Sequence, residues 1–209
     1  AFEFVHVFLE RDGHDVEVYS SDIDHTIYQA RLLYERARSL LYRDKTDDAI
    51  EVVSEAIGSD PSFALAYNLR GRCQKTKERW DLALTDFVRA TELDPEFGEA
   101  YRNVGNALYY LNRTDEMIPT FSRAIELMPE SALAINNRGF AYQRLEKWEL
   151  ALADHARAIE LDPNYAEAHS DKAVALKSLG REEEADEHER IATELKRKGQ
   201  DTSAKKLFY

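Results

Sequence analysis

Small and apolar residues return at fixed positions along most of the chain. The stretch from Ala64 to Phe97 shows the plan most clearly, because its pattern predicts a helix, a turn, a second helix and a closing proline. Prolines recur every 34 residues at the same place in this plan, at Pro61, Pro95, Pro129 and Pro163. A fixed period of this length is typical of a solenoid of stacked repeats rather than of a single globular core.

Three further columns of residues keep the same period. The first holds Ala37, Gly71, Gly105, Gly139 and Ala173, the second Ala49, Ala83, Met117, Ala151 and Ala185, and the third Ala56, Ala90, Ala124, Ala158 and Ala192. Two antiparallel helices approach closely only where a small residue faces a large one, so we expect Gly71 and Ala83 at a helix crossing. Phe87 belongs to a column with Val53, Phe121, His155 and Glu189 and is expected to fill the space beside them.

These columns predict helices that are arranged in five pairs. The first helix begins at a Ser21-Asp22 N-cap and ends near Arg43, and its partner runs from Thr46 to Gly58. The remaining pairs are Ser62–Lys77 with Asp81–Leu93, Glu96–Leu111 with Asp115–Leu127, Glu130–Leu145 with Glu149–Leu161, and Asn164–Leu179 with Glu182–Lys198. A proline cannot continue a helix but suits a first turn, so each proline separates two pairs. Trp80 and Trp148 occupy matching turn positions and are expected to pack across the loop.

The proline ladder and the small-residue columns resemble those of the tetratricopeptide repeat (TPR) family. The resemblance runs from about Ala30 to Gly199 and implies an all-α, right-handed superhelix of five helix-turn-helix units. Its repeats are expected at 30–63, 64–97, 98–131, 132–165 and 166–199, within a domain of residues 27–199. The fifth repeat lacks the closing proline, as suits a terminal repeat whose last face meets water.

One column departs from the family pattern. Where the family has a leucine before the small residue, this chain has Arg36, Arg70, Arg138 and Lys172, and only Val104 is apolar. A long arginine side chain can lay its stem along the groove and keep its charge in water, which predicts a tolerated variant.

The segments that flank the repeats follow other patterns. In residues 1–26 an apolar run precedes an Asp12-Gly13 turn signal, so both a β-hairpin and a helix from Phe2 to Glu10 are compatible with it. This segment is expected to cap the first repeat or to dock on an upstream domain or another chain. Residues 200–209 form a polar tail that ends in Leu207, Phe208 and Tyr209, and we expect it to be flexible.

Composition narrows the range of partners. A net charge of −12 over 209 residues argues against nucleic-acid binding by phosphate neutralisation and against an anionic membrane surface. No run of apolar residues approaches the length of about 20 residues that a membrane-spanning helix needs. The single cysteine, Cys73, cannot form an internal disulfide and fits a cytoplasmic protein with a buried, inert thiol. The chain begins at Ala1 without a methionine, so an upstream leader or domain remains an open alternative.

Function is expected on the concave face, which the family's first helices line. Residues there that point away from the partner helix are the candidates for a ligand: Arg38, Asn68, Arg72, Arg102, Asn103, Asn106, Tyr109, Asn136, Asn137, Phe140 and Arg144. Asparagine can bond an extended peptide backbone and arginine can clamp a carboxylate. The chain is therefore predicted to be a non-enzymatic adaptor that binds an extended or helical, acidic protein segment. The alternative for the asparagines is a framework role that braces neighbouring helices.

One TPR subclass grips the C-terminal carboxylates of heat-shock chaperones, and the resemblance implies its clamp only in part. Arg102, Asn106 and Asn137 match its first three positions. The last two positions, which are basic in that subclass, are Glu167 and Asp171. Two carboxylates there would repel those of the ligand, so the clamp is incomplete and a co-chaperone role is a remote alternative. Those acids could instead accept a basic residue of a different ligand.

Two other functions are weaker alternatives. The N-terminal apolar run or the C-terminal tail could join copies of the chain into a homo-oligomer. The string Asp22-Ile23-Asp24-His25-Thr26 matches the start of an aspartyl-phosphate phosphatase site, but it lacks the strand that such a site needs and reads as an acidic helix start. The six histidines show no metal-ligand spacing, although the repeat register brings His155 and His169 toward one junction. No metal and no cofactor is predicted.

Overall fold

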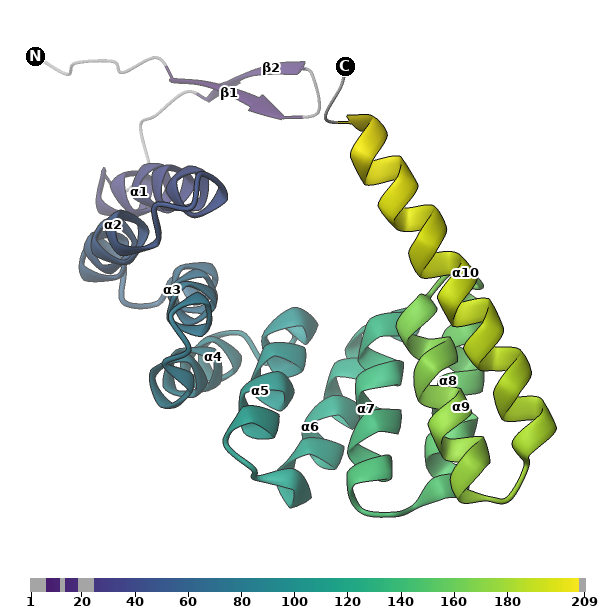
Figure 1. Cartoon of the computed structure of the whole chain (residues 1–209). Helices are drawn as coiled ribbons and strands as arrows, with labels where there is room; N and C mark the ends of the chain where they lie inside the picture. Colours follow the sequence, from purple (N-terminus) through teal and green to yellow (C-terminus); the bar gives the residue numbers. More distant parts are fainter. Residues whose placement is uncertain (1–6, 12–13, 19–24, 207–209) are drawn as a thin grey trace, which may run out of the picture.

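The computed structural model describes residues 7–11, 14–18 and 25–206, with side chains described for residues 25–198. Two strands precede a series of helices in pairs (Figure 1). The elements are β1 (Val7–Arg11), β2 (His14–Val18), α1 (His25–Tyr42), α2 (Thr46–Ser59), α3 (Ala64–Thr76), α4 (Trp80–Leu93), α5 (Gly98–Tyr110), α6 (Thr114–Leu127), α7 (Ala132–Arg144), α8 (Trp148–Leu161), α9 (Ala166–Ser178) and α10 (Glu182–Lys206).

The N-terminal segment forms a β-hairpin. Strands β1 and β2 pair antiparallel, with Val7 opposite Val18 and Arg11 opposite His14. The hairpin alternative is therefore the correct one, because the described end of the apolar run, Val7–Arg11, is a strand and not part of a helix. Within the described residues the strands pair with one another rather than packing extensively on a helix. A capping role for this segment stays a prediction, and the predicted Ser21-Asp22 N-cap lies outside the described residues.

The helices form a curved stack. Each odd-numbered helix packs along the next even-numbered one, and each even-numbered helix packs on the first helix of the following repeat. Contacts also join the first helices of different repeats, as between α5 and α7, whereas the described second helices make no comparable contacts with one another. The first helices therefore lie on the inner side of the arc that Figure 1 shows, and the described chain is an all-α superhelix after its hairpin.

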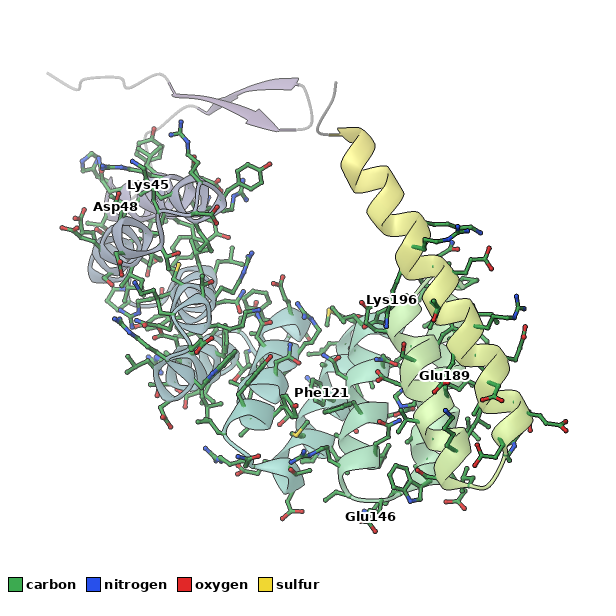
Figure 2. The ribbon with its side chains drawn as sticks, viewed as in Figure 1. Lys45, Asp48, Phe121, Glu146, Glu189 and Lys196 are labelled. Carbon is green, nitrogen blue, oxygen red and sulfur yellow. The ribbon has the colours of Figure 1, made fainter. Side chains whose placement is uncertain are left out.

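The core of the second, third and fourth repeats contains a contact between a glycine and a large ring. An added Cβ at Gly71 would lie 2.6 Å from Cε1 of Phe87, and one at Gly105 would lie 2.5 Å from Cε1 of Phe121, which Figure 2 labels. Phe87 and Phe121 are almost completely buried. In the fourth repeat His155 takes the place of the phenylalanine against Gly139. The predicted glycine and aromatic columns thus meet at the helix crossings.

Two of the three arginines in the departing column, Arg70 and Arg138, form ion pairs that the sequence pattern did not predict, while their side chains stay 26% and 25% exposed. Arg70 donates through Nε and Nη2 to the two carboxylate oxygens of Asp86 at 2.9 and 2.7 Å. Arg138 makes the same pair of bonds to Asp154 at 2.8 Å each. Both aspartates are buried, so each needs its arginine as a counter-ion. The column tolerates arginine because the second helix supplies an acid.

A column that the sequence pattern did not reveal lies in the turn inside each repeat. Its residues all have a positive φ of 56–73°, and they are Asp44, Glu78, Asn112, Glu146 and Gly180. The residue after each of them donates its N–H to the carbonyl five residues earlier, as when Arg79 donates to Gln74 at 3.0 Å. This bond pattern ends a helix with one left-handed residue. The turn geometry is the same in all five repeats although the side chains differ.

We expect Gly180→Ala to lower the free energy of unfolding by about 1 kcal/mol, because a left-handed backbone strains any residue with a Cβ. Nothing lies within 4 Å of the added Cβ, so the loss would be conformational rather than steric. Urea denaturation measures it. Gly58→Ala is the matched control, since Gly58 is exposed and lies inside α2 with equal space around it. Gly58→Ala should raise the free energy of unfolding by about 0.5–1 kcal/mol. Equal effects at both sites would contradict the assignment of a strained, left-handed backbone to Gly180.

The last helix is longer than predicted. It continues to Lys206, whereas the sequence pattern ended it at Lys198. No proline follows its packed portion to stop it, in contrast to the four earlier repeats. Figure 1 shows its C-terminal turns extending beyond the stack. Flexibility of the remaining tail stays a prediction, because residues 207–209 lie outside the described part.

Candidate functional site

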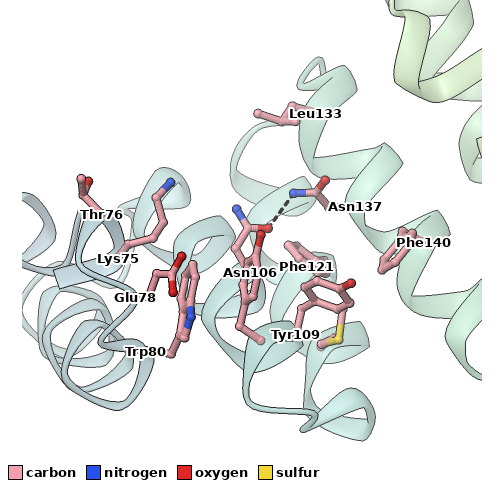
Figure 3. Close-up of a pocket in the computed structure, with 12 residues that line it drawn as sticks. Lys75, Thr76, Glu78, Trp80, Asn106, Tyr109, Phe121, Leu133, Asn137 and Phe140 are labelled. Carbon is pink, nitrogen blue, oxygen red and sulfur yellow. Dashed lines mark hydrogen bonds between the residues drawn. The ribbon is translucent and has the colours of Figure 1, made fainter. Parts of the chain in front are cut away.

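A cleft opens on the inner side of the stack between the second, third and fourth repeats. It has a volume of about 530 Å³, and residues that line it are Lys75, Trp80, Asn106, Tyr109, Asn137 and Phe140 (Figure 3). They come from α3, α4, α5 and α7. Four predicted site residues, Asn106, Tyr109, Asn137 and Phe140, are therefore brought together in one cleft.

One wall of the cleft is aromatic. Trp80 stacks on Tyr110 with ring centroids 3.7 Å apart and planes inclined by 4°. The Tyr109 ring meets Tyr110 and Phe140 edge to face at 5.0 and 5.2 Å. The guanidinium of Arg144 lies 5.8 Å from the centre of the Tyr109 ring, within the range of a cation–π contact. This wall offers a partner a fixed apolar surface with few rotatable bonds.

Sequence reasoning missed Trp80 as a cleft residue. It was expected to pack across the loop of its own repeat, but it stacks on Tyr110 of the next repeat. Trp80 begins a second helix, and the candidates were sought on first helices only. Lys75 and Tyr110 lie on first helices, at concave positions of the pattern, although neither belongs to the predicted site set. The signal that could have found Trp80 is the aromatic pair Tyr109-Tyr110, of which Tyr110 is exposed and can take a stacking partner from another helix.

Two amides lie beside the aromatic wall. Asn137 donates from Nδ2 to Oδ1 of Asn106 at 2.8 Å, as Figure 3 shows. Both side chains are half-buried. This bond leaves the Nδ2 of Asn106 and the Oδ1 of Asn137 without a partner in the described part of the chain. One donor and one acceptor are thus available to a peptide backbone.

The other three asparagines of the predicted site are buried in the stack. Asn103 donates to Asn68 at 2.8 Å across the junction of two repeats. Asn136 donates to Asp171 at 2.8 Å and accepts a bond from Nδ1 of His155 at 2.7 Å. These three side chains are only 3–4% exposed, so they fit the framework alternative. Their bonds brace neighbouring first helices.

Cations gather beside the cleft on α3 and α5. Arg72 and Lys75 have no acidic partner within 4 Å in the described part of the chain. Partial burial lowers the pKa of Lys75 from its usual value, and the charges of Arg102 and Arg72 add to this effect. Burial also lowers the pKa of Arg102, whose acidic neighbour Glu99 is 3.8 Å away. The three positive charges therefore repel one another, although the protein as a whole carries a net negative charge.

The remaining arginines of the predicted site differ from these. Arg38 forms an exposed ion pair with Glu35 at 2.8 Å, one turn along the same helix. Exposed pairs of this kind contribute little to stability. Arg144 is exposed and lies over Tyr109. The positive region that borders the cleft is therefore made by Arg72, Lys75 and Arg102, which we call the cation cluster.

The histidine that lies within hydrogen-bond distance of His169 is His188, whereas the repeat register brought His155 toward it. His169 and His188 approach each other with their Nδ1 atoms 2.9 Å apart, and Nε2 of His169 lies 3.3 Å from the carbonyl of Pro163. His155 bonds to Asn136, and no hydrogen bond joins His155 to His169 among the described residues. Separately, no helix among the described residues combines the length and the apolarity that crossing a membrane requires.

Comparisons with solved structures find the same fold. YrrB, a TPR protein with an unusual peptide-binding site, matches with a TM-score of 0.67 and 24% identity over 78% of this chain and 84% of its own. MamA from Desulfovibrio magneticus RS-1 matches with a TM-score of 0.74 and 20% identity over 81% and 96% of the two chains. Pseudomonas aeruginosa PilF matches with a TM-score of 0.74 and 20% identity over 82% and 78%. No functionally curated protein matches the sequence significantly.

Family models agree with this likeness. Models described as tetratricopeptide repeat match residues 34–84, 74–132, 132–165 and 156–187, which together run without a gap from 34 to 187. Those residues include most of the helical stack and every residue of the cleft. The chain therefore belongs to the tetratricopeptide repeat family.

Proposed function

We propose that the chain is an adaptor that binds an acidic protein segment across the cation cluster and the aromatic cleft. Its fold and its family support a protein-interaction scaffold. The observation that carries the finer proposal is the cation cluster itself, because Arg72, Lys75 and Arg102 stand together in a protein with a net charge of −12. Like charges held this close are stabilised when a partner brings carboxylates.

The cleft adds an apolar contact surface to the electrostatic attraction of the cation cluster. Lys75 belongs both to the cation cluster and to the lining of the cleft. A carboxylate bound at the cluster would therefore lie next to the apolar wall of Tyr109 and Phe140. A ligand with an acidic residue near a bulky apolar one would engage both surfaces, while Asn106 and Asn137 hold its backbone. Tyrosine, tryptophan and arginine are the residue types that dominate binding energy at interfaces.

Other observations limit the alternatives. YrrB shares the fold and has a peptide-binding site of its own, which fits a groove used in this way. The carboxylates of Glu167 and Asp171 at the last two clamp positions oppose the chaperone-tail role. Self-assembly through the N-terminal apolar run or the C-terminal tail stays a prediction from the sequence, because the described structure contains no contact between copies of the chain to test it. A cytoplasmic location is part of the same proposal, and the buried thiol of Cys73 is compatible with it.

The test uses selection from a phage-displayed library of random peptides, followed by fluorescence anisotropy on the selected sequences. We expect the wild type to enrich carboxylates next to an aromatic or aliphatic residue. Arg72→Glu with Arg102→Glu should weaken binding about 100-fold, since loss of each of two interface hot spots costs about 1.4 kcal/mol or more.

A matched control separates local contact from overall charge. Arg43→Glu with Lys147→Glu makes the same change in charge at two exposed turn positions outside the cleft. This pair should leave affinity within about twofold in physiological salt, because charges beyond a Debye length of about 8 Å are screened. Circular dichroism checks that both double variants remain helical. Equal losses in the two would contradict binding at the cation cluster.

A further inference from the structure

The charge on the inner side of the stack changes sign at the fifth repeat. Glu167 and Asp171 both lie on α9, and a spacing of four residues places them on one face of the helix. Glu167 is exposed and Asp171 is half-buried. Neither has a cation within 4 Å in the described part of the chain, although thirteen ion pairs are formed there. We call these two residues the acidic pair.

The acidic pair is held in position by the stack. Oδ2 of Asp171 accepts a bond from Nδ2 of Asn136 at 2.8 Å, and Asn136 is itself buried. Burial raises the pKa of Asp171, and the nearby charge of Glu167 adds to this effect. The charge of Lys196 on the neighbouring helix acts in the opposite direction, but its ammonium donates to Ser170 at 2.9 Å and forms no ion pair with Asp171. A carboxylate that is fixed, partly desolvated and not ion-paired favours an incoming positive charge.

The acidic pair and the cation cluster lie on first helices that follow one another along the stack: Asp171 on α9 bonds to Asn136 on α7, and α7 contacts α5, which carries Arg102. Tyr165, just before α9, links the two regions. Burial raises its pKa to about 12, with further contributions from Glu167 and Asp171, while the charge of Arg102 acts in the opposite direction. One side chain therefore lies within the fields of both groups of charges. A segment bound along the inner face would pass from one to the other.

We propose that the groove is bipolar, so that a bound segment places its carboxylates at the cation cluster and a lysine or arginine of its own at the acidic pair. The inference rests on the proposed function and adds the direction in which the segment lies. An arginine suits the acidic pair best, because its planar guanidinium can bridge two carboxylates. A segment of uniform negative charge is rejected at the fifth repeat by the same two acids.

The peptide selection tests this directly, with Glu167→Lys as the second bait. The wild type should enrich a basic residue on one consistent side of the carboxylates, and Glu167→Lys should enrich an acidic residue there. Enrichment of carboxylates without any basic residue would overturn the bipolar groove and leave the proposed function standing. Absence of carboxylates among the selected peptides would overturn both.

A charge-swap cycle gives the quantitative test. A selected peptide should lose about tenfold in affinity when its basic residue becomes glutamate or when the protein carries Glu167→Lys, and the two changes together should restore most of it. The matched control is Glu51→Lys, which makes the same charge change at an exposed site on α2. Independent, additive losses would contradict contact between the two charges. An equal loss with Glu51→Lys would assign the effect to net charge alone.

Discussion

Gly71→Leu should unfold the second repeat and lower the free energy of unfolding by more than about 3 kcal/mol, the upper part of the range for overpacked cores. Already the Cβ of any substituent would lie 2.6 Å from the ring of Phe87. That ring is fully buried between paired helices and cannot turn aside. Urea denaturation followed by circular dichroism measures the loss, and hydrogen exchange would locate it to α3 and α4.

Two further variants make the prediction specific. Gly58→Leu introduces the same side chain where nothing lies within 4 Å of the added Cβ, so it should be close to neutral. Phe87→Ala empties the space that the introduced leucine side chain would need, so the double variant should be more stable than the sum of the two single losses predicts. A cooperative, unchanged melt for Gly71→Leu would show that the helices do not cross at this residue.

His155 should make the protein lose up to about 3 kcal/mol of stability as the pH falls from 6.5 to 4. Burial lowers the pKa of His155 to about 4 from its usual 6.5, and the charge of Lys172 adds to this effect. The Nδ1–H of the ring donates to Asn136, whose own Nδ2 donates to Asp171. The Nε2 atom is buried without a partner in the described structure, so a proton there would be unsatisfied.

The direction of this pH effect on stability follows from whether the folded or the unfolded state binds the proton more tightly. Between pH 6.5 and 4 the unfolded chain protonates this histidine while the folded chain resists, so stability is complete above the window and falls within it. His188 adds a smaller effect of the same sign, because burial lowers its pKa as well. The measurement is the free energy of unfolding in urea at several values of pH across the window.

The control is His155→Phe, which places in the fourth repeat the residue that faces glycine in the second and third. It removes the titrating group, and it also removes the donor to Asn136, so its stability at neutral pH is not the informative quantity. The informative quantity is the slope of stability against pH, which should become markedly shallower. An unchanged slope would assign the acid sensitivity to other groups.

The sequence by itself determined the repeat, the number of helix pairs and the contacts that depend on the period. The helix predicted at Thr46–Gly58 is observed at Thr46–Ser59, and Ser62–Lys77 is observed at Ala64–Thr76. The glycine and aromatic columns could be paired in advance because a period of 34 residues places equivalent side chains at equivalent crossings. The period relates side chains that are neighbours inside one repeated unit, so it was sufficient to predict the contacts within that unit.

Only the tertiary structure decided which inner residues are free for a partner. Asn103 and Asn106 lie one turn apart on the same helix, yet the first is buried against Asn68 and the second lines the cleft. The angle between neighbouring repeats sets this difference, and it results from many small packing contacts that no single column records. The same angle brings Trp80 of the second repeat onto Tyr110 of the third. Contacts between repeats therefore determine which residues form the candidate site, whereas the pattern within one repeat was enough to predict the fold.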